Sequence, residues 1–184
     1  MKGVPQLLAQ DWFEFSQMLN HVRGVKSILE IGSRFGQSLA RMALVSDVNS
    51  KLVTVDLPVD PYSIGADVHG PLTAECEKLR LHGHEVHQIT GDSHYPDVAD
   101  KVRALGPYDF GFIDGDHTYS GARQDWLEYG PMCQIVAFHD INCPDWGVKN
   151  LWNDIKHDHP YAEYIGGEMG IGVLFRNIKK FQKV

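Results

Sequence analysis

A short apolar segment that ends in glycine and runs directly into a helical pattern is the most constraining feature of this sequence. It reads Ile28-Leu-Glu-Ile-Gly-Ser-Arg-Phe-Gly-Gln-Ser38. A strand that stops at a glycine and leads at once into a helix leaves backbone N–H groups directed into a crevice. Gly32 and Gly36 have no Cβ, so a ligand can lie against the backbone there. The segment therefore predicts a ligand-binding turn after the first strand of an α/β fold.

Length, charge and cysteine usage narrow the class of protein. The 184 residues fit a single domain, with residues 1–24 as a helical extension and residues 25–178 as the core. A formal charge of −7 offers no basic surface for nucleic acid. There is no apolar run of about 18 residues, no signal-peptide pattern and no C-x-x-C spacing among the three cysteines. We therefore expect a cytoplasmic protein with neither a nucleic-acid nor a membrane partner. The expected substrate is small or neutral, either a small molecule or a glycan.

Short apolar runs alternate with helical patterns along the chain. Strands are predicted at 27–31, 52–56, 85–89, 110–113 and 135–138, and helices between them at 37–45, 73–81, 96–105 and 119–129. Gly83, Gly106 and Gly130 follow three of these helices, where a left-handed residue is favoured. This alternation predicts a doubly wound, Rossmann-like parallel sheet with helices on both faces.

The two ends of the chain differ from the middle. Residues 12–22 form an amphipathic pattern that we expect to pack across the sheet edge, and a helix is predicted at 146–157. Two final strands, at 161–165 and 170–176, would add one antiparallel strand to the sheet. The irregular stretch 57–70 is long for a compact domain, which favours a lid over the ligand.

Polar residues follow the predicted strands, and ligands of an open parallel sheet bind outside the carboxyl ends of the strands. Asp56 follows the second strand and is placed to accept hydrogen bonds from two ribose hydroxyls; the alternative is a cap or turn residue. Asp114 ends the fourth strand, and His139 and Asp140 end the fifth. Neighbouring parallel strands lie about 4.8 Å apart, so these three side chains should converge.

Two motifs resemble a known family. The pattern E-x-G-x-x-x-G-x-S, from Glu30 to Ser38, resembles the first motif of class I S-adenosylmethionine-dependent methyltransferases. The segment I-D-G-D-H-x-Y at 113–119, together with H-D-I at 139–141, resembles the Methyltransf_24 family of these enzymes. The resemblance extends from about residue 27 to 176. One departure is Met132-Cys-Gln134, where the family has a glycine turn.

The resemblance implies a seven-stranded, mostly parallel sheet and S-adenosylmethionine as the cofactor. It implies that Glu30 lies near the amino-acid end of the cofactor and Asp92 near the adenine amino group, although Asp92 could instead cap a turn. The cofactor-binding residues predicted in this way and from the strand ends are Glu30, Gly32, Ser33, Gly36, Ser38, Asp56, Asp92, Ser93 and Asp114.

The predicted catalytic residues are His117, His139 and Asp114. Carboxylates with an imidazole suit a divalent ion, and Asp114, His139 and Asp140 are the predicted ligands of Mg²⁺ or Mn²⁺. In related catechol-type enzymes an Asp stands where this chain has His139, so a metal-free site with a histidine base is the alternative. His117 either takes the proton of a substrate hydroxyl or caps the following helix through Asp114 or Asp116.

Tyr119 and Trp146 are weaker candidates for contact with the substrate. Tyr119 either orients the substrate or packs on a helix face, and Trp146 could form a wall of the pocket. The chain has no inserted cap domain, so the pocket is either open or completed by a second subunit, as in a homodimer.

Methyl transfer to a hydroxyl is the leading hypothesis for function. The chain lacks the N/D-P-P-Y/F segment of enzymes that methylate amino groups of bases, and its expected pocket is acidic and histidine-bearing. The alternatives are a non-catalytic S-adenosylmethionine-binding domain, a hydroxylase-like relative of the cephalosporin hydroxylase type, and a nicotinamide-dependent oxidoreductase. The absence of G-x-G-x-x-G argues against the last of these.

Overall fold

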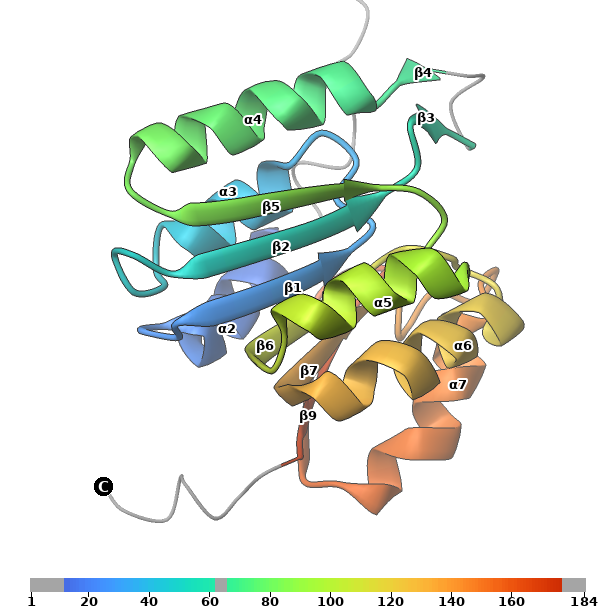
Figure 1. Cartoon of the computed structure of the whole chain (residues 1–184). Coiled ribbons are helices and arrows are strands. Elements are labelled where there is room, and N and C mark those ends of the chain that lie inside the picture. Colours follow the sequence, from blue (N-terminus) through green and yellow to red (C-terminus); the bar gives the residue numbers. More distant parts are fainter. Residues whose placement is uncertain (1–11, 62–65, 177–184) are drawn as a thin grey trace, which may run out of the picture.

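A seven-stranded sheet with helices on both faces forms the body of the molecule in this computed structural model (Figure 1). The structure describes residues 12–61 and 66–176. The strand order is β5-β2-β1-β6-β7-β9-β8, and β9 runs antiparallel to both of its neighbours. The strands are β1 (Ser27–Ile31), β2 (Lys51–Asp56), β5 (Glu85–Thr90), β6 (Tyr108–Ile113), β7 (Cys133–His139), β8 (Tyr161–Tyr164) and β9 (Ile171–Phe175). The predicted fold class is confirmed.

Helices of the described ranges cover both faces of the sheet (Figure 1). One face carries α2 (Trp12–Val22), α3 (Gln37–Ala43) and α4 (His69–Leu81), and the other carries α5 (Pro96–Leu105), α6 (Tyr119–Tyr129) and α7 (Val148–Ile155). Side chains alternate along each central strand, so Ile28 packs into one layer and Leu29 into the other. Apolar strands are therefore required, because both faces are covered.

The amphipathic helix α2 packs on one face of the sheet beside the edge formed by β9 and β8, in line with the expected position at the sheet edge. Its buried residues Phe15, Met18 and Val22 share a core with Phe112 of β6 and Val173 of β9. The side chains of Met18 and Val22 are fully buried, and each such burial contributes about 1.5–3 kcal/mol.

Two of the three glycine predictions were wrong. Gly83 has the expected positive φ of 96°. Gly106 has φ −73° and ψ −179°, because the following proline excludes the helical region and favours an extended residue. Gly130 has φ −52° and continues into a 3₁₀ turn, Gly130–Met132. A Cβ there would lie 2.3 Å from the Trp126 ring, so packing requires this glycine.

The stretch 57–70 is more regular than predicted. It contains a small antiparallel pair, β3 (Val59–Asp60) and β4 (Ala66–Asp67), and the first residues of α4. Residues 62–65 of the predicted lid lie outside the described part, as do the chain ends that the predicted domain limits include. No helix within the described ranges is both long and apolar enough to cross a membrane.

Candidate active site

A cavity of about 950 Å³ opens at the carboxyl ends of β1, β2, β5, β6 and β7. These strands are parallel, so the loops that follow them meet at one edge of the sheet. Most of the residues predicted to form the site line this cavity: Gly32, Ser33, Ser38, Asp56, Asp92, Ser93, Asp114, His117, His139 and Asp140. Glu30 and Gly36 are not part of the lining.

Glu30 lies beneath the cavity and supports the turn above it. Its side chain is fully buried, and the Ser33 hydroxyl donates a hydrogen bond to it. Burial raises the pKa of Glu30 to about 8; hydrogen bonds from Ser33 and Ser38 oppose this rise. Strand alternation explains the position, because Glu30 shares a face of β1 with the core residue Ile28. Its predicted contact with the cofactor stays a prediction.

Gly32 and Gly36, the two glycines of the first motif, allow neighbouring parts of the protein to pack closely against the turn after β1. Gly32 has φ 84°, and a Cβ there would lie 2.2 Å from the backbone oxygen of Asp114. The Asp114 N–H also donates to the Ile31 carbonyl at 2.8 Å, which joins the ends of β1 and β6. At Gly36, with φ 79°, a Cβ would lie 3.1 Å from side-chain atoms of Leu72 and Glu75. Of the two, Gly32 alone leaves backbone on the cavity wall.

Asp56 and Asp92 occupy the end of the cavity formed after β2 and β5. Asp56 accepts a hydrogen bond from the Arg34 N–H, so it helps to shape the first turn. Burial raises the pKa of Asp56, and backbone hydrogen bonds from Arg34, Ser33 and Leu57 oppose this. Asp92 Oδ1 accepts the His94 N–H at 2.9 Å. The turn-capping contact is thus present at Asp92, on a residue that also lines the cavity.

His94 is a cavity residue that the sequence analysis missed. Its Nε2 lies 3.3 Å from Oδ1 of Asp125, a fully buried carboxylate that also accepts the Ser93 hydroxyl at 2.7 Å. The hydrogen bond with Asp125 raises the pKa of His94 to about 9, against the opposing effect of burial. Asp92 and Asp116 add to the rise. The position of His94 directly after Asp92 and Ser93 could have indicated that it lines the cavity. Its pairing with Asp125 depends on how α6 packs, which the sequence does not show.

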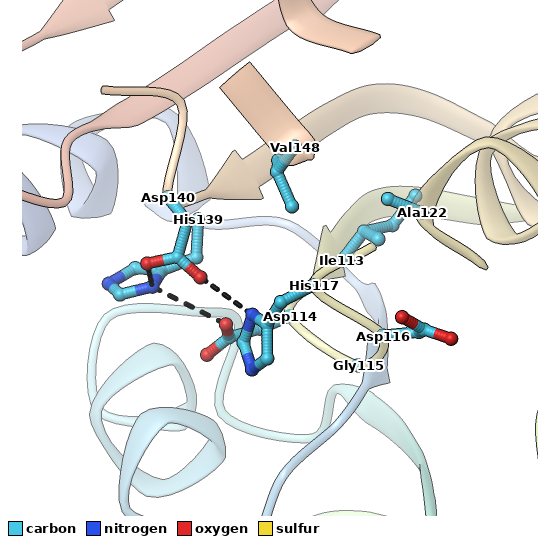
Figure 2. A pocket seen from close by; sticks show the side chains of 9 residues that line it. All are labelled: Ile113, Asp114, Gly115, Asp116, His117, Ala122, His139, Asp140 and Val148. Carbon is cyan, nitrogen blue, oxygen red and sulfur yellow. Dashed lines mark ion pairs between the residues drawn. The ribbon is translucent and has the colours of Figure 1, made fainter. Parts of the chain in front are cut away.

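Two histidines share the carboxylate of Asp140 (Figure 2). Nδ1 of His117 lies 2.7 Å from Asp140 Oδ2, and Nδ1 of His139 lies 2.8 Å from Asp140 Oδ1. His139 Nδ1 is also 3.4 Å from Asp114 Oδ1. Asp140 is almost fully buried and has φ 64°, an uncommon conformation for a residue with a side chain. Burial would raise its pKa, but the two imidazoles outweigh burial and lower it to about 2.

The structure groups the possible metal ligands differently from the sequence analysis. One ligand atom each from Asp114, His117 and Asp140 can be chosen so that all lie within 4.8 Å of one another. His117 therefore joins the two aspartates, in the place predicted for His139. Mixed carboxylate and imidazole donors fit a divalent ion. The loop after β6 brings His117 back over the end of β7, and sequence spacing alone could not show this.

The side chains around His117 test three further interpretations. Trp146 lines the cavity, and its ring centroid lies 3.5 Å from that of His117. Thr118 is the residue that caps α6, by accepting the Gly121 N–H, so the interpretation of His117 as the helix cap was wrong. Tyr119 does not line the cavity and donates to Asp154 of α7 at 2.8 Å. Tyr119 therefore packs on a helix face rather than facing the substrate site.

Comparison with known proteins finds one matching family, and the match includes both sequence motifs. Residues 29–141 match the Methyltransf_24 family, described as a methyltransferase domain. A search of curated proteins finds no significant match.

Solved structures share the fold at low sequence identity. An O-methyltransferase from Bacillus cereus in complex with SAH has a TM-score of 0.62 at 18% identity, over 94% of this chain and 82% of that one. The O-methyltransferase TomG from Streptomyces achromogenes in complex with SAM has a TM-score of 0.66 at 15% identity, over 95% of this chain and 84% of that one. A precorrin-6y C5,15-methyltransferase from Geobacter metallireducens has a TM-score of 0.65 at 9% identity, over 95% of this chain and 92% of that one.

The family match covers more than half of the chain and includes the strand ends that form the cavity. The chain therefore belongs to the Methyltransf_24 family of class I S-adenosylmethionine-dependent methyltransferases.

Proposed function

We propose that the protein transfers a methyl group from S-adenosylmethionine to a hydroxyl of a small molecule or sugar. When bound, the cofactor supplies an electrophilic methyl group on a sulfonium centre. The observation that carries the proposal is the pair of histidines held on Asp140 at the carboxyl ends of β6 and β7, inside the cavity. Such a pair fits an acceptor that must lose a proton during transfer.

The end of the cavity after β1, β2 and β5 suits the cofactor. Asp56 presents a carboxylate for the ribose hydroxyls, and Asp92 and Ser93 stand where the adenine would lie. Acidic residues around the cavity favour a sulfonium ligand with an ammonium group over a dinucleotide pyrophosphate. The volume of about 950 Å³ leaves room for an acceptor as well.

His117 and His139 are the candidate general bases. Both direct Nδ1 at Asp140, which is ionised because its pKa is near 2. A carboxylate at Nδ1 favours the tautomer with its proton on that nitrogen, so Nε2 can accept the hydroxyl proton. Asp140 would then stabilise the imidazolium that forms. A positioned base typically contributes about 10²–10⁴-fold in rate, and alignment of donor and acceptor supplies much of the rest.

Metal assistance is an alternative form of the same reaction. Asp114, His117 and Asp140 would hold Mg²⁺ or Mn²⁺, which would stabilise a developing alkoxide or phenoxide. His117 could not then act as the base, because a ligating nitrogen has no lone pair for the proton. His139 would keep that role. Chelation experiments distinguish the two forms.

Transfer to oxygen, rather than to another atom, is supported by two structural neighbours named as O-methyltransferases. The precorrin methyltransferase with the same fold has a different acceptor, so the fold alone does not identify it. A non-catalytic domain is disfavoured because Asp56, Asp114 and both histidines are present in the cavity. Cytoplasmic location, a glycan acceptor and a homodimer stay predictions.

Binding and turnover measurements test the proposal. Calorimetry of the full chain should give micromolar binding of S-adenosylhomocysteine, about −8 kcal/mol, and no binding of NAD or of Fe²⁺ with 2-oxoglutarate. Radiolabelled methyl transfer from S-adenosylmethionine to a panel of phenols, sugars and hydroxy acids should then reveal a product. Binding of Fe²⁺ with 2-oxoglutarate in place of S-adenosylhomocysteine would support the hydroxylase alternative and contradict the proposal.

A further inference from the structure

An arginine at the α2 end of the cavity is the starting point. Arg41 lies in α3, one turn beyond Ser38, and lines the cavity together with Gln37 and Phe15. The charged groups that share this cavity with it are mostly acidic: Asp56, Asp60, Asp92, Asp114, Asp116 and Asp140. Arg34, a second arginine on the wall, is bound to Asp60 at 2.8 Å.

Aromatic rings, rather than carboxylates, hold the Arg41 side chain. Its guanidinium carbon lies 5.2 Å from the ring centroid of Trp12 and 5.8 Å from that of Phe15. Within the described residues, this guanidinium forms no ion pair or side-chain hydrogen bond. Stacking on aromatic rings fixes the plane of a guanidinium and leaves its N–H groups to bind an anion in a bidentate manner.

A row of aromatic contacts relates Arg41 to the catalytic histidines. Phe15 packs edge-on against Phe112, with ring centroids 5.8 Å apart, and Phe112 packs edge-on against His139 at 6.3 Å. All three rings line the cavity. Arg41 and His139 therefore lie on the same wall, separated by two phenylalanine rings. Phe112 and His139 belong to β6 and β7, whereas the proposed nucleoside site at Asp56 and Asp92 lies at the ends of β2 and β5, on the other side of β1 in the sheet order.

We propose that Arg41 binds an anionic group of the methyl acceptor, so that the substrate is a hydroxy compound that carries a carboxylate or phosphate. This inference rests on the proposed function. The acceptor would place its hydroxyl at His117 or His139 and its apolar body along Phe15 and Phe112. Carboxylates repel an anion over most of the cavity. Of the cationic groups that line it, Arg34 pairs with Asp60 and His94 with Asp125, whereas aromatic rings hold Arg41. The charge would thus fix the orientation of the acceptor.

Paired probes that differ only in charge test the inference. Protein saturated with S-adenosylhomocysteine is titrated with 4-hydroxybenzoate, 4-hydroxyphenyl phosphate and the neutral 4-hydroxybenzamide. We expect the wild type to bind both anions at least about tenfold more tightly than the amide, and Arg41→Gln to lose this preference. Arg23→Gln changes the net charge equally at an exposed residue that does not line the cavity and whose side chain donates a hydrogen bond to Asn20, so it should keep the preference.

Cofactor binding separates the possible failures. Affinity for S-adenosylhomocysteine should stay within about twofold in Arg41→Gln, with an unchanged circular dichroism spectrum. A loss of affinity for S-adenosylhomocysteine but not for 5′-methylthioadenosine, which lacks the amino-acid part, would assign Arg41 to the cofactor carboxylate and overturn the inference. Equal binding of anions and amide by the wild type, or a preference retained by Arg41→Gln, would also overturn it. Failure of the wild type to bind S-adenosylhomocysteine would instead refute the proposed function.

Discussion

Replacement of Gly32 by alanine should destabilise the protein far more than the same change at Gly24. Both glycines have positive φ, 84° and 70°, so alanine at either position carries a conformational cost of about 1–2 kcal/mol. A Cβ at Gly24 would meet nothing within 4 Å. At Gly32 it would lie 2.2 Å from the Asp114 oxygen, 2.5 Å from the Asp114 carbonyl carbon and 2.7 Å from the Gly115 Cα.

The size of the difference follows from which atoms must move. All three contacts at Gly32 are backbone atoms, so the ends of β1 and β6 must separate by about 1 Å to restore a normal van der Waals distance. Overpacking of this kind costs about 1–3 kcal/mol. The hydrogen bond from Asp114 to Ile31, now 2.8 Å, would weaken and add about 1 kcal/mol. We therefore expect about 3–6 kcal/mol for Gly32→Ala and about 1–2 kcal/mol for Gly24→Ala.

Urea denaturation followed by fluorescence measures both values, and calorimetry reports binding of S-adenosylhomocysteine. Gly32→Ala should also weaken binding, because Asp114 and the first turn move with the strand ends, whereas Gly24→Ala should not. Equal destabilisation of the two variants, within about 0.5 kcal/mol, would refute the argument that contact between β1 and β6 requires this glycine.

Four further predictions concern the cavity. Asp56→Ala should weaken S-adenosylhomocysteine binding by at least about 1.5 kcal/mol, through loss of two charge-assisted hydrogen bonds; unchanged affinity in calorimetry would remove the ribose assignment. If a metal is required, EDTA should abolish methyl transfer and Mg²⁺ or Mn²⁺ should restore it, whereas full activity in EDTA combined with loss in His139→Ala would leave only the base role. The pKa of His94 is raised to about 9, so its pairing with Asp125 stabilises the fold fully below pH 6.5. This stabilisation is lost as the pH rises through 9. Asp125→Asn should remove this decline in the free energy of unfolding and lower the His94 pKa measured by NMR. Tyr119→Phe should leave methyl transfer unchanged and cost less than about 1 kcal/mol of stability, because the Tyr119 hydroxyl contacts Asp154 at an exposed position outside the cavity. A large loss of activity would show instead that Tyr119 contacts the substrate.

The sequence determined the order of elements and the edge at which the site forms. Apolar runs separated by helical patterns locate the five parallel strands, because strands covered on both faces must be apolar along their length. The residues just after those runs, such as Asp56, Asp114 and His139, meet at one edge because parallel strands all end there. Local periodicity and strand direction are sufficient for these predictions.

Tertiary structure alone decided which side chains pair and which face the cavity. Asp140 lies between His117 and His139, Asp125 pairs with His94, and Arg41 lies over the rings of Trp12 and Phe15 in α2. Each of these contacts, apart from that between His139 and its neighbour Asp140, joins segments distant in the sequence. Distances between such segments depend on how helices pack on the sheet and how loops turn back over strand ends. Periodicity along one strand or helix carries no information about either.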